Sequence, residues 1–200
     1  MRALSALFAA GLFAIGCRAS GASPDWGAIR AELAQRVAED QALRVQLSTD
    51  AEPDMAFFER LSATDEANTA WMKELVARHG WPTIARVDAA GAGDAWLLVQ
   101  HADHDVDFQE HCLELLRAAA AADQASAKHL AYLEDRVAMH RGRPQRYGTQ
   151  FVQAPAGQSG FVPHTLADEA RVDELRASVG LGPLAEYARQ INGKNGDGED

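Results

Sequence analysis

Residues 97–109 read Leu97-Leu98-Val99-Gln100-His101-Ala102-Asp103-His104-Asp105-Val106-Asp107-Phe108-Gln109. Positions 100–109 place two histidines, three aspartates and two glutamines between apolar flanks. At about 100° per residue, a helix would put His101 and Asp105 on the same face as the apolar residues of this stretch. Buried polar groups need hydrogen-bond partners. We therefore predict one helix over 94–122 with a polar site on its core-facing side.

A divalent metal site is the first chemical interpretation of this pair. An imidazole and a carboxylate one turn apart, His101 and Asp105, can bind a single ion. His104 or Asp135 would complete a set suited to zinc, manganese or iron, and the protein would then be a metal-dependent hydrolase. The sequence contains no HExxH motif and no second helix with matching ligand spacing, which argues against this interpretation.

Two metal-free interpretations stay open beside it. In the first, His101 acts as a general base oriented by Asp105, and the catalytic candidates are His101, Asp105, Asp135 and Tyr147, with Thr149 as a further donor. No GxSxG nucleophile motif and no glycine-rich phosphate loop accompanies them. In the second, the same groups form a satisfied buried network whose role is structural.

A second polar segment follows the residue pair Arg143-Pro144. The alternation over 145–152 predicts a strand, and 161–162 is expected to return as its hairpin partner. A glycine inside a strand marks a bulge or a close approach of the backbone. Gly148 is therefore expected at such a point.

This segment is predicted to form one wall of the polar site. We expect Tyr147 to meet the helix that carries Asp135, and Gln145 or Tyr147 to lie within hydrogen-bond reach of His101 and Asp105. The predicted pocket, for a small ligand or a protein partner, consists of Gln100, His101, His104, Asp105, Gln109, Asp135, Arg136, Gln145, Tyr147, Thr149 and Gln150.

Helical patterns account for most of the remaining chain. The first helix is expected to start at Asp25, a suitable cap, and to contain an ion pair between Asp40 and Arg44. A second is expected from 64–66 to Gly80, and 89–93 is expected to be a flexible loop.

Later helices are predicted between Ser126 and Gly142, over 168–178 and over 183–191. The predicted fold class is a mainly α, single-domain helical bundle with one small β-hairpin. Cys112 is expected to be a small buried hydrophobe without a disulfide partner.

The charge balance narrows the range of partners. The chain has 19 basic and 29 acidic side chains, a formal net charge of −10. An acidic chain without a basic stripe argues against a nucleic-acid partner and against adhesion to anionic lipid by charge. Any membrane contact is expected to be made through a covalently attached lipid.

The amino-terminal sequence predicts export. Met1-Arg2 is a short basic start, and 3–15 is an apolar run too short to span a bilayer. Ala14-Ile15-Gly16-Cys17 resembles a bacterial lipobox, with Ala14 where leucine is usual, which predicts a lipid on Cys17. Ordinary cleavage after Ala19 or Ala22 is the alternative.

These features predict the organisation of the chain and its location. We expect a signal peptide over 1–16, a tether over 17–24, one mainly helical domain over 25–191 and a disordered tail over 192–200. Arg18 follows the lipidated cysteine in place of an aspartate. The expected location is therefore the cell envelope, and the outer membrane in a bacterium with two membranes.

Three motifs together resemble a bacterial domain-of-unknown-function family, DUF6624. They are Gly80-Trp81-Pro82, the stretch Gln100-His101-Ala102-Asp103-His104-Asp105 with Phe108-Gln109, and Asp135-Arg136 followed by Gly142-Arg143-Pro144-Gln145-Arg146-Tyr147-Gly148-Thr149-Gln150. Asp40-Gln41 with Arg44, and Gly180-Leu181 with Tyr187, also fit. Asp88 departs from the pattern, near a position where the family has glycine. The resemblance spans 31–187 and implies a shared fold and polar site, without implying a reaction.

The sequence as a whole indicates an exported, lipid-anchored envelope protein of undefined activity with a polar pocket. Whether it is an enzyme stays open, and the only cofactor considered is a divalent metal at His101 and Asp105.

Overall fold

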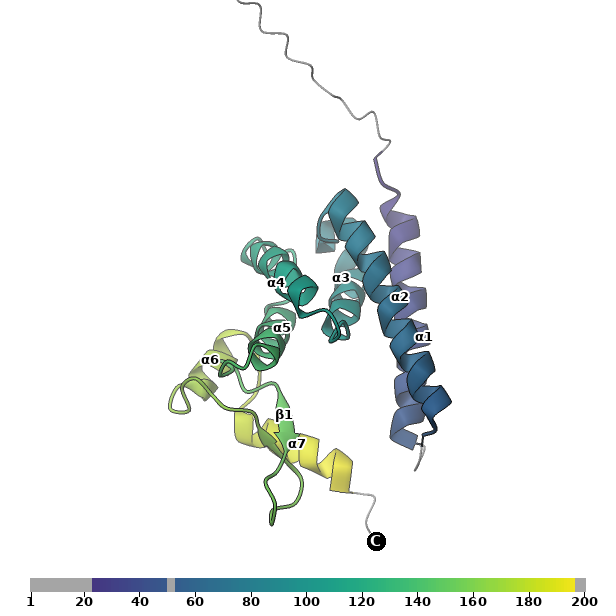
Figure 1. Ribbon diagram of the computed structural model, residues 1–200. Coiled ribbons are helices and arrows are strands. Elements are labelled where there is room, and N and C mark those ends of the chain that lie inside the picture. Colours follow the sequence, from purple (N-terminus) through teal and green to yellow (C-terminus); the bar gives the residue numbers. More distant parts are fainter. Residues whose placement is uncertain (1–22, 50–52, 197–200) are drawn as a thin grey trace, which may run out of the picture.

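The computed structural model describes residues 23–49 and 53–196. Within them the chain forms seven helices and one two-stranded antiparallel hairpin, so the predicted mainly α single domain is confirmed (Figure 1). The elements in order are α1 (Trp26–Thr49), α2 (Met55–His79), α3 (Ile84–Gln100), α4 (Val106–Ala121), α5 (Ala127–His140), β1 (Phe151–Gln153), β2 (Phe161–Pro163), α6 (Val172–Ser178) and α7 (Leu184–Gly196). The predicted signal peptide and Cys17 lie outside the described residues.

Helices α1, α2 and α3 form one packed group, and α4 packs against α5 (Figure 1). The core between them is built from buried aliphatic residues such as Leu33, Met72, Leu98, Leu116 and Leu133. Cys112 belongs to this core, and burial raises the pKa of its thiol to about 12, as expected for an inert residue. Among the described helices, none combines the length and apolar character needed to cross a membrane.

The ends of several helices follow the predicted local signals. Asp25 accepts a hydrogen bond from the backbone of Ala28, and Ser126 caps α5. Gly80 ends α2 with a φ of +73°. The predicted start of α2 near residue 64 is wrong, because Asp54 caps a continuous helix from Met55 and nothing in the sequence between interrupts it.

Residues 89–93, predicted as a loop, belong to α3. The helix is instead kinked at Asp88, which has φ 59° and ψ −178° and whose carboxylate accepts a hydrogen bond from Gly91 N at 3.0 Å. A Cβ on Gly91 would lie 2.9 Å from the Val87 Cβ. The glycine therefore permits close packing where the prediction assigned it to flexibility.

The predicted continuous helix over 94–122 is also wrong, because the chain breaks between α3 and α4. Asp105 caps α4 by accepting a hydrogen bond from Phe108 N at 3.0 Å, which competes with continued helix. The buried Gln109 amide donates to the last carbonyls of α3, Val99 O at 3.1 Å and Gln100 O at 3.3 Å. The break is therefore a turn held by specific hydrogen bonds, and we call it the α3–α4 junction.

The carboxyl-terminal part packs around a loop and the hairpin. β1 and β2 pair as predicted, but 145–150 is a loop rather than the first part of a strand. Helix α7 continues to Gly196, so the first residues of the predicted disordered tail are helical. The Asn192 side chain binds both backbone groups of Phe161 and ties α7 to the hairpin.

The kink generates a stability prediction. The Asp88 backbone lies in a region essentially restricted to glycine, at a cost of about 1–3 kcal/mol. Asp88→Gly removes that strain and loses an exposed ion pair with Arg30 and a cap that glycine replaces at a cost of a few tenths of a kcal/mol. We expect Asp88→Gly to raise the free energy of unfolding by about 1 kcal/mol in urea titrations.

Asp88→Ala is the matched control, because alanine keeps the strain and loses the cap. It should destabilise the protein by about 1 kcal/mol. Equal effects of the two substitutions would contradict this explanation of the kink.

Candidate functional site

The α3–α4 junction brings His101 against a buried carboxylate from α1. Its Nδ1 lies 3.1 Å from Asp40 Oδ1 and 3.0 Å from Asp40 Oδ2, although the two residues are 61 positions apart. Asp40 is fully buried, whereas 15% of the His101 side chain is exposed. Nε2 of His101 has no hydrogen-bond partner within the described residues.

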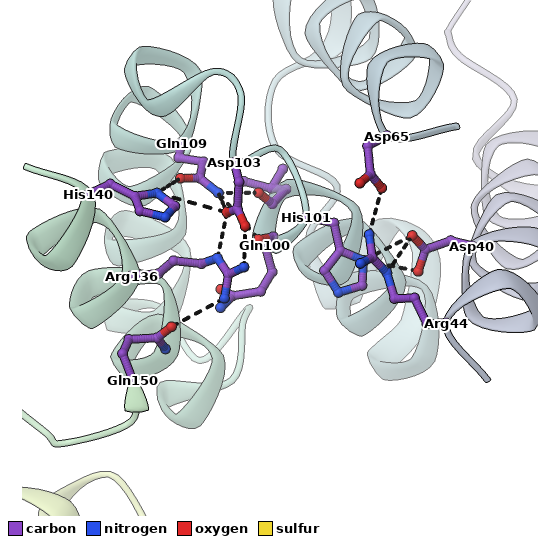
Figure 2. A network of polar contacts seen from close by, with 11 residues as sticks. Asp40, Arg44, Asp65, Gln100, His101, Asp103, Gln109, Arg136, His140 and Gln150 are labelled. Carbon is purple, nitrogen blue, oxygen red and sulfur yellow. Dashed lines mark hydrogen bonds and ion pairs between the residues drawn. The ribbon is translucent and has the colours of Figure 1, made fainter. Parts of the chain in front are cut away.

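Two further side chains hold the Asp40 carboxylate. Gln41 donates to Oδ2 at 2.7 Å and Arg44 Nε donates to Oδ1 at 3.0 Å. Arg44 Nη2 also donates to Asp65 at 2.6 Å, so its guanidinium bridges the two carboxylates (Figure 2). We call Asp40, Gln41, Arg44, Asp65 and His101 the Asp40 cluster.

The pKa values within the Asp40 cluster follow from burial and charge. Burial acts to raise the pKa of Asp40, but the hydrogen bond and charge of His101, with Gln41 and Arg44, outweigh it and lower that pKa. Burial dominates at Asp65, whose pKa is raised. Asp40 is therefore an ionised acceptor at neutral pH, and His101 Nδ1 is the donor to it.

Asp40, Asp65 and His101 offer ligand atoms within 4.8 Å of one another, a spacing compatible with a metal ion. Arg44, however, already places a positive charge between the two carboxylates. A divalent ion would have to displace this guanidinium or sit beside it against charge repulsion. The geometry therefore favours a metal-free cluster.

Asp105, predicted as the partner of His101, points elsewhere. It caps α4 and forms an ion pair with Lys73 of α2, and this lysine lowers the pKa of its carboxyl. His104, another predicted pocket residue, is exposed. The break in the helix explains the error, because residues 101 and 105 share a face only if the helix continues through them.

A second cluster lies on the other side of the junction. Arg136 from α5 forms a two-point ion pair with Asp103 and donates to Gln150 Oε1 at 3.2 Å (Figure 2). Gln109 donates to Asp103 at 3.1 Å, and His140 Nδ1 lies 3.3 Å from Gln109 Oε1. We call these five residues the Asp103 cluster.

Asp135 has a structural task next to this cluster. Its fully buried carboxylate accepts hydrogen bonds from the backbone of Arg146, Tyr147 and Thr149 and from the Thr149 hydroxyl, at 2.7–3.1 Å. Burial raises the pKa of this carboxyl, and the loop donors act in the opposite direction. The predicted structural role of Asp135, which pins 145–150 onto the helices, matches these bonds.

Among the described residues, no hydrogen bond joins Gln145 or Tyr147 to His101 or Asp105, contrary to the prediction from the sequence. Gln145 uses its amide within the hairpin, on Gln150 and His164 O. The charged groups acting on the Tyr147 hydroxyl, whose pKa burial raises, are Glu134, Arg146, Asp135 and Arg117 rather than the junction residues. The loop reaches the junction through Gln150, Arg136 and Asp103 instead.

Gly148 lies at a close approach, as predicted. Its φ is +64°, and a Cβ there would come within 2.9 Å of Leu184 Cδ1 on α7.

Gln100 lies between the two clusters and is incompletely satisfied. It is 6% exposed, and its Oε1 is a buried acceptor without a hydrogen-bond partner in the described structure. In Figure 2 the Gln100 side chain extends toward Arg136, whereas the His101 ring turns toward Asp40. Unpaired buried acceptors are rare in folded proteins. The junction therefore offers two uncommitted acceptor atoms on neighbouring residues, Gln100 Oε1 and His101 Nε2.

The sequence prediction missed Asp65, Asp103 and His140 as site residues, and treated Asp40 and Arg44 only as an ion pair along the helix. That ion pair is present at 3.0 Å. The available signal was the pairing of an aspartate and an arginine, Asp40 and Arg44, within a motif that also fits the family resemblance.

The Asp40 cluster generates a pH prediction. Because its pKa is lowered on folding, the Asp40 carboxylate contributes stability above its ordinary pKa of 3.8, and that contribution is lost as the pH falls through the lower value of the folded state. Asp40→Asn should lower the free energy of unfolding by about 2–3 kcal/mol at pH 7. The difference from wild type should shrink below about pH 4 in urea titrations.

Glu169→Gln, at an exposed acidic side chain, should change stability by less than about 0.5 kcal/mol throughout. An Asp40→Asn deficit that stays constant from neutral to acidic pH would contradict the prediction.

Comparison with known proteins places this architecture in a family. Residues 27–197 match the family model described as "Family of unknown function (DUF6624)". Neither a search of curated proteins nor a search of solved structures gives a match. Because the family match covers most of the chain, the protein belongs to DUF6624, a family of unknown function.

Proposed function

We propose that the protein binds a small ligand that donates hydrogen bonds at the α3–α4 junction. The single observation that carries the proposal is the unpaired, buried Gln100 Oε1, on the residue that precedes His101, whose Nδ1 is held by Asp40. A buried acceptor without a partner costs free energy, which a bound donor would recover. The Gln109 amide holds the turn that carries both residues by donating to Val99 O at 3.1 Å.

The protonation pattern indicates the ligand's chemistry. Because the ionised Asp40 accepts from Nδ1 of His101, the neutral form of this imidazole carries its hydrogen on Nδ1 and has its lone pair on Nε2. Gln100 Oε1 is also an acceptor. Each atom therefore needs a hydroxyl, amine or amide hydrogen from the ligand, which an ionised carboxylate or phosphate oxygen does not supply.

The surrounding charges favour the same class of ligand. The four carboxylates of Asp40, Asp65, Asp103 and Asp105 face three cations, Arg44, Arg136 and Lys73, which leaves the junction with one net negative charge. Neutral and cationic donors are therefore favoured over anions. A ligand hydroxyl on Nε2 would also be placed for proton removal, the role of a general base.

A metal-dependent hydrolase is the second candidate, supported by the spacing of Asp40, Asp65 and His101. The Arg44 bridge weighs against it. A purely structural network is the remaining interpretation, and the experiment below separates all three.

The proposed location is the cell envelope, with the domain held by lipid on Cys17. This part of the proposal is supported by the basic start, the apolar run and the lipobox-like Ala14-Ile15-Gly16-Cys17.

The binding proposal is tested by thermal unfolding against a panel of sugars, polyols, primary amines and dipeptide amides, with Zn²⁺ and Mn²⁺ as separate members. A ligand at about 100 times its Kd stabilises the folded state by about 2.7 kcal/mol. We expect at least one hydroxyl- or amine-bearing compound to raise the Tm of the wild type. His101→Asn should abolish the shift, because asparagine keeps a donor near Asp40 and lacks Nε2.

His104→Asn is the matched control, since it removes an exposed histidine three residues away, and it should retain the full shift. A shift that survives His101→Asn, or a panel in which no compound stabilises the wild type, contradicts the proposal. Stabilisation by a metal that disappears in Asp40→Asn would favour the hydrolase candidate instead.

The location is tested by fractionation of cells that produce wild type or Cys17→Ser. We expect wild type in the membrane fraction with a lipid mass on Cys17, and the variant in the soluble fraction. A soluble wild type without added lipid mass contradicts the lipid anchor.

A further inference from the structure

We propose that a cavity between α5 and the α6–α7 connection binds a small anion that carries a carboxylate or phosphate group. The cavity, which we call the Arg176 cavity, has a volume of about 220 Å³ and is lined by Lys128, Tyr132, Arg176, Glu186, Tyr187 and Gln190, together with the loop from Gly180 to Pro183. It shares no residue with the α3–α4 junction, so the two proposals stand or fall separately.

Arg176 is a buried cation without an anionic partner. The side chain is 2% exposed, and its donors meet only neutral carbonyls, from Nε to Gly182 O at 2.6 Å and from Nη1 to Tyr147 O at 2.7 Å and Gly148 O at 3.3 Å. No carboxylate of the described residues lies within 4 Å of it. Buried charges are normally paired, because an unpaired one retains much of its desolvation cost.

The nearest acidic groups are committed to other tasks. Asp173 accepts a hydrogen bond from Leu184 N at 2.7 Å at the start of α7, and Asp135 holds the backbone of the 146–149 loop. Both are close enough to act on the guanidinium electrostatically, yet burial still lowers the pKa of Arg176. An added anion would therefore be the first direct counter-charge to this side chain.

The donors that remain on Arg176 suit an oxyanion. Nε and Nη1 hold the loop carbonyls, and Nη2 has no partner among the described residues, so its two N–H groups are uncommitted. A guanidinium is the side chain best matched to carboxylate and phosphate oxygens. Arg176 therefore holds the loop carbonyls and still has N–H donors available for a bound anion.

Lys128 brings a second positive charge to the same cavity. It is exposed and forms no ion pair in the described part of the chain. The aliphatic part of the Lys128 side chain packs closely on the loop at Gly180, which has φ +76°. A Cβ at Gly180 would lie 3.2 Å from Lys128 Cε. Lys128 and Arg176 together outnumber the single acidic lining residue, Glu186, in a protein whose net charge is −10.

Two tyrosines complete the polar wall. Tyr132 and Tyr187 are in edge-to-face contact, with ring centroids 6.3 Å apart, and the Arg176 guanidinium lies 5.1 Å from the Tyr187 ring centre. Burial raises the pKa of Tyr187, which keeps its hydroxyl protonated. The cavity is smaller than the roughly 300–1,000 Å³ of sites for drug-sized ligands, which restricts the occupant to a small anion.

The proposal is tested by isothermal titration of the intact chain with inorganic phosphate, and in a separate arm with acetate and succinate, all at matched ionic strength. We expect saturable binding in at least one arm. Lys128→Gln should weaken it about tenfold, the effect of losing one charge-assisted hydrogen bond of about 1.4 kcal/mol. This variant removes an exposed, unpaired side chain and leaves the loop carbonyls bound to Arg176.

Arg189→Gln is the matched control, because it removes a positive charge from an exposed position of α7 outside the cavity. It should change the affinity less than twofold. Phosphate binding alone identifies a phosphate ligand, and carboxylate binding alone a carboxylate ligand. Absence of saturable binding in both arms, or equal weakening by Lys128→Gln and Arg189→Gln, would overturn the proposal.

Discussion

The buried carboxylate of Asp135 is the interaction on which the carboxyl-terminal half depends. It replaces the water it loses on folding with donors from a single loop, and so fixes the backbone of 146–149 against α5. Once that loop is fixed, its outward carbonyls can be held by Arg176 and its Gln150 can reach Arg136. Hydrogen bonds thereby attach the hairpin, α6 and α7 to the helical core.

At the α3–α4 junction a second buried carboxylate, that of Asp40, also needs hydrogen-bond donors. Asp40 finds its partners within the protein, whereas His101 Nε2 and Gln100 Oε1 remain uncommitted in the described residues. At the Arg176 cavity the imbalance has the opposite sign, because a cation lacks an anion. The two proposed sites therefore select opposite ligands, a hydrogen-bond donor at the junction and an anion at the cavity.

Local signals in the sequence were enough for the fold class and for several helix ends, because caps such as Asp25, Ser126 and Gly80 act within one turn of the residues they serve. The role of Asp135 was also accessible, since a buried aspartate needs donors and the next polar segment supplies them. The pairing of His101 with Asp40 was not, because it joins residues 61 positions apart and depends on a break that periodicity alone does not reveal. Asp88 shows the same limit for periodicity, because hydrophobic spacing does not reveal the kink in the backbone at this residue.

The proposed site depends on a buried, ionised Asp40 that holds His101 as the Nδ1–H tautomer and leaves Nε2 as an acceptor. Long-range ¹H–¹⁵N correlation spectra of the histidine side chains at neutral pH test it directly, with the exposed His104 as an internal reference. We expect the neutral form of His101 to be almost entirely the Nδ1–H tautomer in the wild type, and Asp40→Asn to remove this bias. A His101 ring that is protonated at Nε2, or that shows the same tautomer mixture as His104, would contradict it.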